Sequence, residues 1–229
     1  MLKAIIFDFN GVILNDEPFH FAAMRDAVAD LGIRLTREDY WSKYLPFDDK
    51  ECLESVCRDR SFSLDETTRS ETLERKARNY QQALQGGYPL LPGAAQFIEA
   101  AAGRYPLALA SGARRVEIES ALDSIGLRRY FTVIVAAEDF VLGKPNPESF
   151  LLALQWLNEA RNTAPILPEE CLVIEDSVGG VRGARVAGMH CLAVTSSYPG
   201  EALQAADRVV STLENIALDG LNDLFEEVR

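Results

Sequence analysis

Short apolar runs that alternate with helical patterns are the feature of this sequence that most limits its fold. Five such runs and a weaker sixth carry almost no charge, and the central ones are rich in β-branched residues, as buried parallel strands are. This alternation predicts an α/β fold built on a doubly wound parallel sheet. The expected strands are 4–7, 107–110, 132–136, 172–174, 191–194 and the weaker 208–210, and the expected helices are 92–104, 115–125, 146–158 and 178–187.

The texture of the chain changes between the first expected strand and the second. Residues 17–86 show helical periodicity and many charges, as in HFAAMRDAVADLG, and they contain no convincing strand. The flanks at 15–18 and 86–89 are rich in residues that form turns. We therefore expect an all-helical cap domain at 16–88, inserted into a core made of 1–15 and 89–229.

The composition bounds what the protein can bind. The 229 residues include 23 Lys and Arg against 35 Asp and Glu, and the net charge of −12 disfavours nucleic acid and anionic membranes as partners. No apolar stretch reaches the roughly 20 residues of a membrane span, and the first residues do not read as a secretory signal. A cytoplasmic monomer is expected. With two histidines and no CxxC spacing, reduced thiols are expected rather than a zinc site: Cys52, Cys57, Cys171 and Cys191.

Polar side chains stand where the expected strands end. In an open α/β sheet, ligands bind beyond the carboxyl ends of the strands, which meet at one edge. The first strand ends at an acid, the second at a hydroxyl and a glycine, the third leads to a lysine, and the fourth ends at an acidic pair. We expect these residues to converge on one crevice: Asp8, Ser111, Gly112, Lys144, Glu175 and Asp176.

The types of these residues indicate a chemistry. Three crowded carboxylates repel one another unless a divalent cation neutralises them, and oxygen ligands without His or Cys suit Mg²⁺. The cation keeps Asp8 ionised and able to attack an electrophile. Ser111, which is also a candidate helix N-cap, and the amides after it, such as that of Gly112, could donate to phosphoryl oxygens, and Lys144 adds positive charge. The pattern predicts attack on a phosphoryl group through an aspartyl-phosphate.

Four stretches at these strand ends, FDFNGV, LASGA, GKPNPESF and VIEDS, resemble the motifs of the haloacid dehalogenase-like hydrolase superfamily, in the same order and over nearly the whole chain. The insertion resembles the cap of the branch that includes beta-phosphoglucomutase and sugar-phosphate phosphatases. The resemblance implies a Rossmann-like core and a Mg²⁺-dependent hydrolase of small phosphorylated metabolites. It also implies that Asp8 is the nucleophile and that Ser111 and Lys144 hold the phosphoryl group. The implied Mg²⁺ ligands are the Asp8 side chain, the main-chain carbonyl of Asn10 and Asp176, with Glu175 as a nearby or alternate ligand.

Position 10 departs from the family pattern. Members that act on phosphate usually carry Asp there as the general acid and base, and the amide of Asn10 cannot exchange a proton. General acid–base catalysis supplies roughly 10²–10⁴-fold in rate, so a loss of that order is expected. Three explanations stay open: an enzyme that is slower or finds its proton elsewhere, a phosphometabolite-binding protein without turnover, and an engineered Asp-to-Asn variant of a phosphatase or phosphoglucomutase-like enzyme.

Substrate selection is expected to lie in the cap and on the rim of the core. His20 stands in the first cap turn, where this branch of the family places a histidine near the active site. The expected specificity loop at 45–51, LPFDDKE, contains Lys50 and lacks the arginine with which mutases of the family hold a second phosphate. That absence puts mutase activity in doubt. Arg114 and Arg115 are candidates for a second phosphate, although exposed arginines at the start of a helix are usually only solvated.

Two further expectations concern charged residues of the cap. Asp16 and Glu17, at the hinge, are conceivable proton carriers in place of residue 10, although an unpaired hinge acid usually faces solvent. A phosphonatase of the family would use a cap lysine as a Schiff base. No cap lysine stands in a setting that marks it out for this role: Lys43, Lys50 or Lys76.

Overall fold

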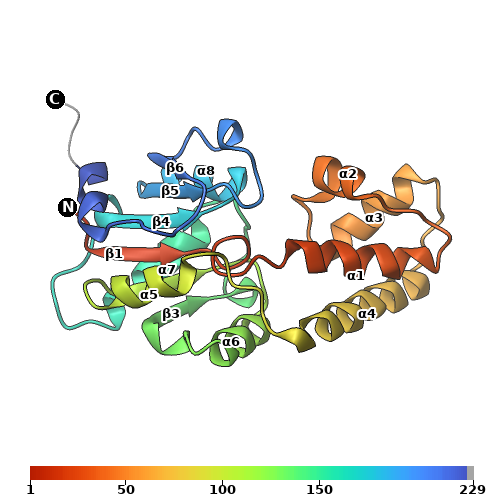
Figure 1. Ribbon diagram of the computed structural model, residues 1–229, viewed down its shortest axis with the longest axis horizontal. Helices are drawn as coiled ribbons and strands as arrows, with labels where there is room; N and C mark the ends of the chain where they lie inside the picture. The colour runs from red at the N-terminus through yellow and green to blue at the C-terminus, as the bar shows by residue number, and fades with distance from the viewer. Residues whose placement is uncertain (226–229) are drawn as a thin grey trace. The chain divides into compact units, whose positions relative to one another are not determined.

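The protein divides into two compact units, and the computed structural model describes residues 1–225 of the chain (Figure 1). The core unit comprises Met1–Asn15 and the chain from Tyr88 onward, and the helical unit comprises Asp16–Gly87. Each unit has a hydrophobic core of its own, and no core cluster of the described residues draws on both units.

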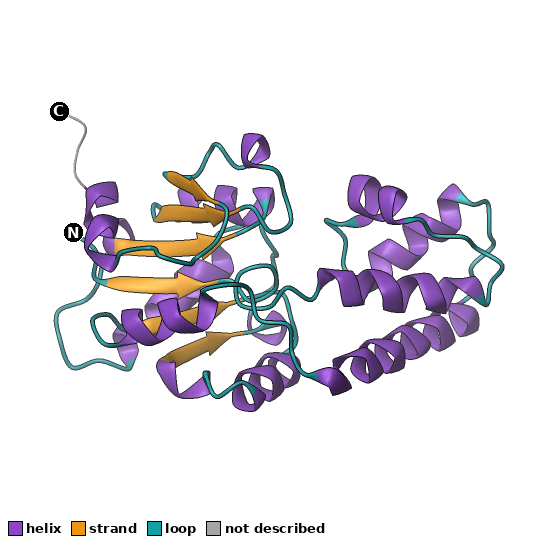
Figure 2. Cartoon of the chain, in the orientation of Figure 1, coloured by secondary structure: helices purple, strands orange, loops and turns teal. Residues whose placement is uncertain are grey.

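Six strands, all paired in parallel, form the sheet of the core unit in the order β3-β2-β1-β4-β5-β6 (Figures 1 and 2). The chain winds outward in one direction from β1 to β3 and in the other from β4 to β6, so the order reverses between β1 and β4. This arrangement confirms the predicted doubly wound α/β fold. The strands are β1 (Ala4–Phe7), β2 (Leu107–Ala110), β3 (Phe131–Val135), β4 (Cys171–Glu175), β5 (His190–Val194) and β6 (Arg208–Val210).

Helices cover both faces of the sheet because successive strand residues point to opposite sides. Phe7 lies in the cluster that includes Phe97 of α5, and the two rings are 6.0 Å apart. Its neighbour Ile6 lies in the other cluster, with Phe150 of α7. The helices of the core unit are α5 (Ala94–Ala102), α6 (Arg115–Ser124), α7 (Glu148–Glu159) and α8 (Val178–Val186), with short 3₁₀ segments at Arg128–Tyr130, Ala137–Asp139, Pro168–Glu170, Gly200–Ala202 and Leu218–Phe225.

The helical unit contains no strand between Asp16 and Gly87, a span that is described throughout. Carboxylate caps set two of its helix starts: Asp48 accepts from the Glu51 N–H and Asp65 from the Thr68 N–H, each at 2.8 Å. The elements are α1 (Glu17–Ala29), α2 (Arg37–Asp39), a π-helical turn (Tyr40–Tyr44), α3 (Asp49–Asp59), α4 (Glu66–Ala83) and a 3₁₀ turn (Leu84–Gly86). Met24, Val28, Leu53 and Val56 are among the residues of its core.

The chain leaves the core unit and returns to it at neighbouring points. Leu14 and Leu90 form an antiparallel bridge. The Asn15 N–H donates to the Pro89 carbonyl at 2.7 Å, and the Leu91 N–H donates to the Ile13 carbonyl at 2.9 Å. The two crossings are thus paired through their backbones within the core unit, before the helical unit begins.

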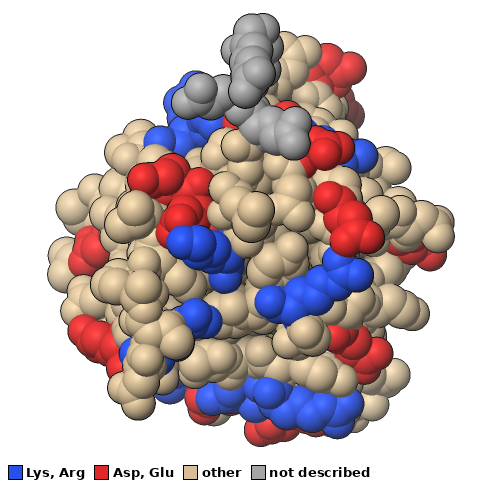
Figure 3. All heavy atoms as spheres, turned by 90° about the vertical axis from the view of Figure 1, so that its left-hand side faces the viewer, with Lys and Arg blue, Asp and Glu red and all other residues tan. Residues whose placement is uncertain are grey.

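Charges of both signs are mixed on the face of the core unit that carries the amino ends of the strands. Figure 3 shows Lys and Arg lying among Asp and Glu on that face. Just before the strands, Lys3 pairs with Glu170 at 2.5 Å, and Asp207 pairs with Arg185 at 2.7 Å. Among the described residues, no helix combines the length and the apolar character that a membrane crossing needs.

Candidate active site

The carboxyl ends of four neighbouring strands bring polar side chains to one edge of the sheet. Phe7 at the end of β1 pairs in register with Leu109 of β2 and Ile174 of β4. The residues after these strand ends continue the pairing, since the Asp8 N–H donates to the Ile174 carbonyl at 2.9 Å. The polar side chains at the end of β4 and just after the strands are buried at this edge: Asp8, Ser111, Glu175 and Asp176.

Lys144, from the loop after β3, lies between two of the carboxylates. Its Nζ is 2.5 Å from Asp8 Oδ1 and 2.5 Å from Glu175 Oε1, and it stands 4.9 Å from the centre of the Phe150 ring. Burial favours the neutral amine, but the charges of Asp8 and Glu175 outweigh burial and hold the pKa of Lys144 above its usual value. Lys144 therefore carries a fixed positive charge beside Asp8.

Glu175 is fully buried and its carboxylate accepts from four donors. Besides Lys144 on Oε1, its Oε2 accepts from the Asp176 N–H at 2.7 Å and from the Ser177 N–H and hydroxyl at 2.8 and 3.0 Å. A Cβ at Gly180 would lie 1.8 Å from Glu175 Oε1, so α8 packs directly on this carboxylate. In these contacts Glu175 fixes Lys144 and the turn that leads into α8.

The crowding of buried acids shifts their pKa values. Burial raises the pKa of Asp8 to about 7, with Glu175 adding to the rise and Lys144 opposing it. The pKa of Asp176 is raised well above its usual value by burial first and then by the charges of Glu175 and Asp8. A further cation at this edge would stabilise the ionised forms of both aspartates.

The donor set fits Mg²⁺, which prefers oxygen ligands and takes few of them from the protein. The two aspartate carboxylates and the main-chain oxygen of Asn10 are such donors. Because the pKa values of Asp8 and Asp176 are raised, a bound cation would favour their ionised forms. Within residues 1–225, no three His, Cys, Asp or Glu side chains are grouped to hold a metal ion. Any metal here would depend on the main-chain oxygen as well as on the carboxylates.

Asn10 and Gly11 lie in the turn that follows Asp8 and begins at Phe9. Asn10 Oδ1 is buried and accepts no hydrogen bond from any described residue. Gly11 has a φ of +77°, and a Cβ there would lie 1.9 Å from Asp176 Oδ2. The absence of a side chain at Gly11 is therefore what lets this turn approach the acidic residues after β4.

Two serines that the sequence analysis missed reach the same place. Ser196 and Ser197 follow β5, whose carboxyl end lies on the same edge of the sheet. The Ser196 hydroxyl donates to the Gly11 carbonyl, and the Ser197 hydroxyl donates to Asp176 Oδ2. The signal was available, because the rule that singled out the ends of the first four expected strands applies equally to the fifth.

The residues after β2 differ from the prediction that Ser111 caps the following helix. The helix α6 begins at Arg115 with Arg114 in the cap position, so Ser111 is not the helix N-cap; its hydroxyl accepts from the Ala113 N–H at 3.2 Å. Gly112 follows it on the surface. Arg114 pairs with Glu117 at 2.9 Å. Arg115 contacts Asp139 at 2.5 Å, so a second phosphate would have to compete with carboxylates for both arginines.

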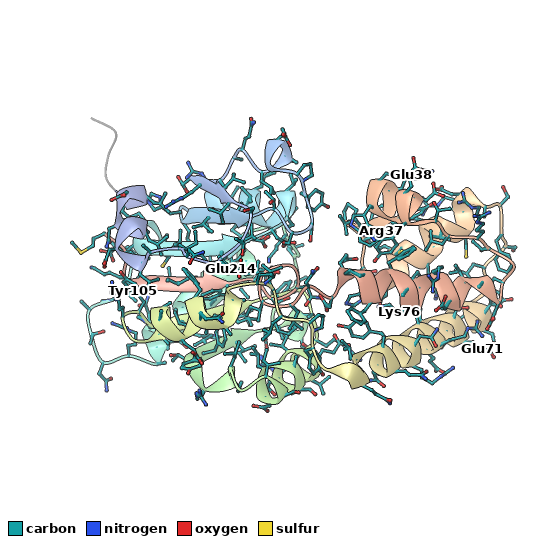
Figure 4. The ribbon with its side chains drawn as sticks, viewed as in Figure 1. Arg37, Glu38, Glu71, Lys76, Tyr105 and Glu214 are labelled. Carbon is teal, nitrogen blue, oxygen red and sulfur yellow. The ribbon has the colours of Figure 1, made fainter. Side chains whose placement is uncertain are left out.

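In the helical unit, Lys76 corrects the expectation that no cap lysine has a special setting. Lys76 lies on α4 with its side chain directed toward α1 (Figure 4), and it is only 2% exposed. Its Nζ is 2.7 Å from His20 Nδ1 and 2.6 Å from an Asp49 oxygen. The His20 ring also stacks on Tyr80 at 4.2 Å, so His20 belongs to a connected polar cluster of this unit. Lys50, the other cap residue predicted to contact substrate, is exposed in the first turn of α3.

The expectation that the hinge acids face solvent is wrong for Asp16 and incomplete for Glu17. Asp16 is fully buried, accepts from the Tyr80 hydroxyl at 2.6 Å and lies 3.3 Å from His20 Nε2. Glu17 is half-buried and accepts from the Tyr40 hydroxyl at 2.6 Å. Local sequence could not reveal these partners, because Tyr80 lies 64 residues from Asp16.

Comparison with known proteins gives consistent matches over most of the chain. A family model described as haloacid dehalogenase-like hydrolase matches residues 2–188. The chain is 31% identical to a phosphorylated carbohydrates phosphatase of Thermotoga maritima, with 98% of this chain and 100% of that protein covered. It is 30% identical to the chloroplastic 5-amino-6-(5-phospho-D-ribitylamino)uracil phosphatase of Arabidopsis thaliana, covering 96% of this chain but only 57% of that longer protein.

Among solved structures, the chain resembles an aspartate-to-asparagine mutant of CbbY from Rhodobacter sphaeroides, in complex with xylulose-1,5-bisphosphate. The TM-score is 0.81 at 28% sequence identity, with 96% of this chain and 99% of that chain covered. A structure described as a putative beta-phosphoglucomutase from Thermotoga maritima gives a TM-score of 0.76, also at 28% identity, and covers 97% of this chain and 99% of that one. The likeness therefore extends over both units of the chain.

Proposed function

Because the chain belongs to the haloacid dehalogenase-like hydrolase family, we propose that it is a Mg²⁺-dependent phosphatase of small phosphorylated metabolites that works through an aspartyl-phosphate on Asp8. The observation that carries this proposal is the contact of Lys144 with Asp8, beside Asp176, at the carboxyl edge of the sheet. The Thermotoga and Arabidopsis relatives, both named as phosphatases, support the reaction class.

Asp8 is the nucleophile of the proposed reaction. One of its oxygens attacks the phosphorus of a phosphate ester, and an oxygen–phosphorus bond to Asp8 forms as the bond to the ester oxygen breaks. The departing oxygen takes up a proton. A water then attacks the phosphorus, which releases inorganic phosphate and restores the Asp8 carboxylate. Lys144, the Ser111 hydroxyl and the Gly112 amide bind the phosphoryl oxygens, whose charge they stabilise in the transition state.

Asp8, Asp176 and the main-chain carbonyl of Asn10 are the groups that would hold Mg²⁺. When bound, the ion supplies positive charge that favours ionised Asp8 and offsets the charge of the phosphoryl oxygens. We assign Glu175, which the sequence analysis named as a nearby or alternate ligand, to the support of Lys144, because its two oxygens already accept four hydrogen bonds. His20 and Lys50 of the helical unit, with Arg114, are proposed to select the substrate.

Asn10 limits the rate of this reaction. Its amide can donate to the ester oxygen or accept from water, but it can neither deliver nor remove a proton. The buried Oδ1 without a partner among the described residues is consistent with a group that faces substrate. The second candidate function, a phosphometabolite-binding protein without turnover, rests on the same residue. An aspartate-to-asparagine mutant was the form of the Rhodobacter relative solved with a bisphosphate, so bound phosphate compounds belong in the test.

Phosphate release from a panel of sugar phosphates, sugar bisphosphates and other small phosphorylated metabolites tests the proposal. The chain as written would be compared with Asn10→Asp, each with Mg²⁺ and with a chelator. We expect Mg²⁺-dependent release that is roughly 10²–10⁴-fold faster with Asp at position 10, the range that general acid–base catalysis supplies. Asn15→Asp, the same change at an exposed position, is the matched control and should leave the rate unchanged.

The outcomes separate the two functions. Asp8→Asn in the Asn10→Asp background should abolish release, since it removes the nucleophile. If neither the chain as written nor Asn10→Asp turns over while phosphate esters still bind, the protein is a binder and the phosphatase proposal fails. Equal rates for these two forms would show that another group carries the proton, and Asp16→Asn would then be the next variant to measure.

A further inference from the structure

The serines after β5 connect two loops that are otherwise held by different strands. One loop follows β1 and contains Asn10 and Gly11; the other follows β4 and contains Asp176. Ser196 donates to the Gly11 carbonyl and Ser197 donates to Asp176 Oδ2, so adjacent residues of one segment bond to both loops. A Cβ at Gly11 would lie 3.0 Å from Ser197 Oγ and 1.9 Å from Asp176 Oδ2, which means that the three are in direct contact.

The hydrogen bond from Ser197 fixes the orientation of the Asp176 carboxylate. The last torsion of an aspartate side chain is broad and roughly two-fold, so an unsupported carboxylate samples a range of orientations. Asp176 is 5% exposed and its Oδ2 accepts from the Ser197 hydroxyl. A donor fixed on one oxygen orients the other, as outer partners of metal ligands do in general.

The bond from Ser196 acts on the backbone. The turn after Asp8 is closed by the Ile13 N–H donating to the Phe9 carbonyl at 2.8 Å and by the Gly11 N–H donating to the Leu14 carbonyl at 2.6 Å. The Gly11 carbonyl accepts from the Ser196 hydroxyl. The Asn10 carbonyl shares its planar peptide group with the Gly11 N–H, which Leu14 holds, and Ser196 anchors the next peptide group of the turn. With both peptide groups anchored, the direction of the Asn10 carbonyl is restricted.

We propose that Ser196 and Ser197 are positioning residues that orient the Asn10 main-chain oxygen and the Asp176 carboxylate for a divalent cation. The inference rests on the proposed function for the location of the cation and goes beyond it in naming a segment after β5 as part of the site. Neither serine touches the reacting atoms. Their effect is on the affinity for the metal rather than on the chemical step at saturating metal.

Binding of Mn²⁺, followed by electron paramagnetic resonance, and of Mg²⁺, followed by calorimetry, tests the proposal on the full chain with Asn10 in place. No turnover is needed, so the measurement does not depend on the catalytic rate of this form. We expect Ser197→Ala to weaken Mn²⁺ binding about 10–100-fold and Ser196→Ala to weaken it in the same direction, the range found for outer partners of metal ligands. Ser197→Thr, which keeps the hydroxyl, should restore most of the affinity. Ser211→Ala, an exposed serine just after β6, is the matched control.

Each result has a distinct meaning. If Ser197→Ala and Ser196→Ala bind Mn²⁺ as tightly as the parent, the positioning role is overturned, even where thermal unfolding shows a loss of stability. If Ser197→Ala does not fold, unchanged affinity of Ser196→Ala overturns the role by itself. If the parent binds neither cation, the Mg²⁺ site of the proposed function fails together with this inference. Weak binding in the alanine variants, with recovery in Ser197→Thr, supports it.

Discussion

Gly11 is the residue at which the approach of the two loops is most demanding. Its φ of +77° lies in the left-handed region, and the space that a side chain would take is already filled by Asp176. Gly32, in the loop after α1, has almost the same φ, +74°, but no atom lies within 4 Å of where its Cβ would stand. The pair therefore separates backbone strain from steric conflict.

We predict that Gly11→Ala destabilises the protein more than Gly32→Ala does. Gly32→Ala carries only the cost of a left-handed residue, about 1–2 kcal/mol. Gly11→Ala adds an overpacked contact with Asp176, typically another 1–3 kcal/mol or so. Urea unfolding of the two variants and the parent measures the difference. Equal losses would mean that the turn after Asp8 shifts freely to admit a methyl group.

The start of α1 carries the clearest effect of burial on an acid outside the core unit. Burial raises the pKa of Glu17 above its usual 4.5, against the opposing charge of His20 and the hydrogen bond from the Tyr40 hydroxyl. The folded state therefore binds this proton more tightly than the unfolded chain does. The stability that Glu17 contributes is complete below the unfolded pKa and is lost as pH rises through the folded pKa.

We predict that Glu17→Gln gains stability relative to the parent as the pH rises from about 4 to about 7, since the amide keeps an acceptor for Tyr40 and never ionises. Urea unfolding at three pH values, followed through Trp41 beside Tyr40, measures the difference. Glu71→Gln, an exposed acid on α4 (Figure 4), should show no such trend. A difference that stays flat with pH would mean that Glu17 ionises as readily in the folded state as in the unfolded chain.

The sequence predicted the elements well because buried parallel strands leave a plain apolar signature. Strands β1, β2 and β6 have the expected bounds. β4 starts one residue earlier and ends one residue later than expected, because Cys171 pairs with Ala4, and Glu175 pairs with Ala193 although it is charged. A charge at a strand end hides its pairing, since nothing local shows that the charge will be buried.

The candidate site was predictable where chain order alone places a residue at a strand end, as for Asp8 and Asp176. Contacts that depend on packing between distant helices were not. Nothing in the neighbouring sequence marks out Lys76, yet it is buried against His20, which lies 56 residues away on α1.

At the scale of the whole molecule, the separate cores of the two units predict that a destabilising substitution in one core affects mainly the unfolding of its own unit. Leu53 lies in the hydrophobic core of the helical unit. Leu157 lies on α7, in the hydrophobic cluster that this helix forms with one face of the sheet of the core unit. Both side chains are fully buried. Each unit also has one tryptophan: Trp41 packs 5.4 Å from Phe21, and Trp156 packs against the cluster that contains Leu157.

We predict that Leu53→Ala shifts the unfolding transition reported by Trp41 more than the one reported by Trp156, and that Leu157→Ala does the reverse. A buried Leu→Ala change costs about 2–5 kcal/mol. Fluorescence of variants that keep one tryptophan, Trp41→Phe or Trp156→Phe, separates the two transitions. If both tryptophans report the same shift for each alanine variant, the two units unfold as one cooperative system.

The paired crossings at Leu14–Asn15 and Pro89–Leu90 allow the helical unit to be replaced as a whole, because both of its ends join the core unit at neighbouring points. The inserted chain closes on itself at one place on the core, and each doubling of such a loop costs only about 0.6 kcal/mol of closure entropy. One set of helices can thus be exchanged for another by recombination at two adjacent points, while the strand ends keep their residues. Proteins related in this way can therefore differ in their helical insertion and still share the same residues at the strand ends.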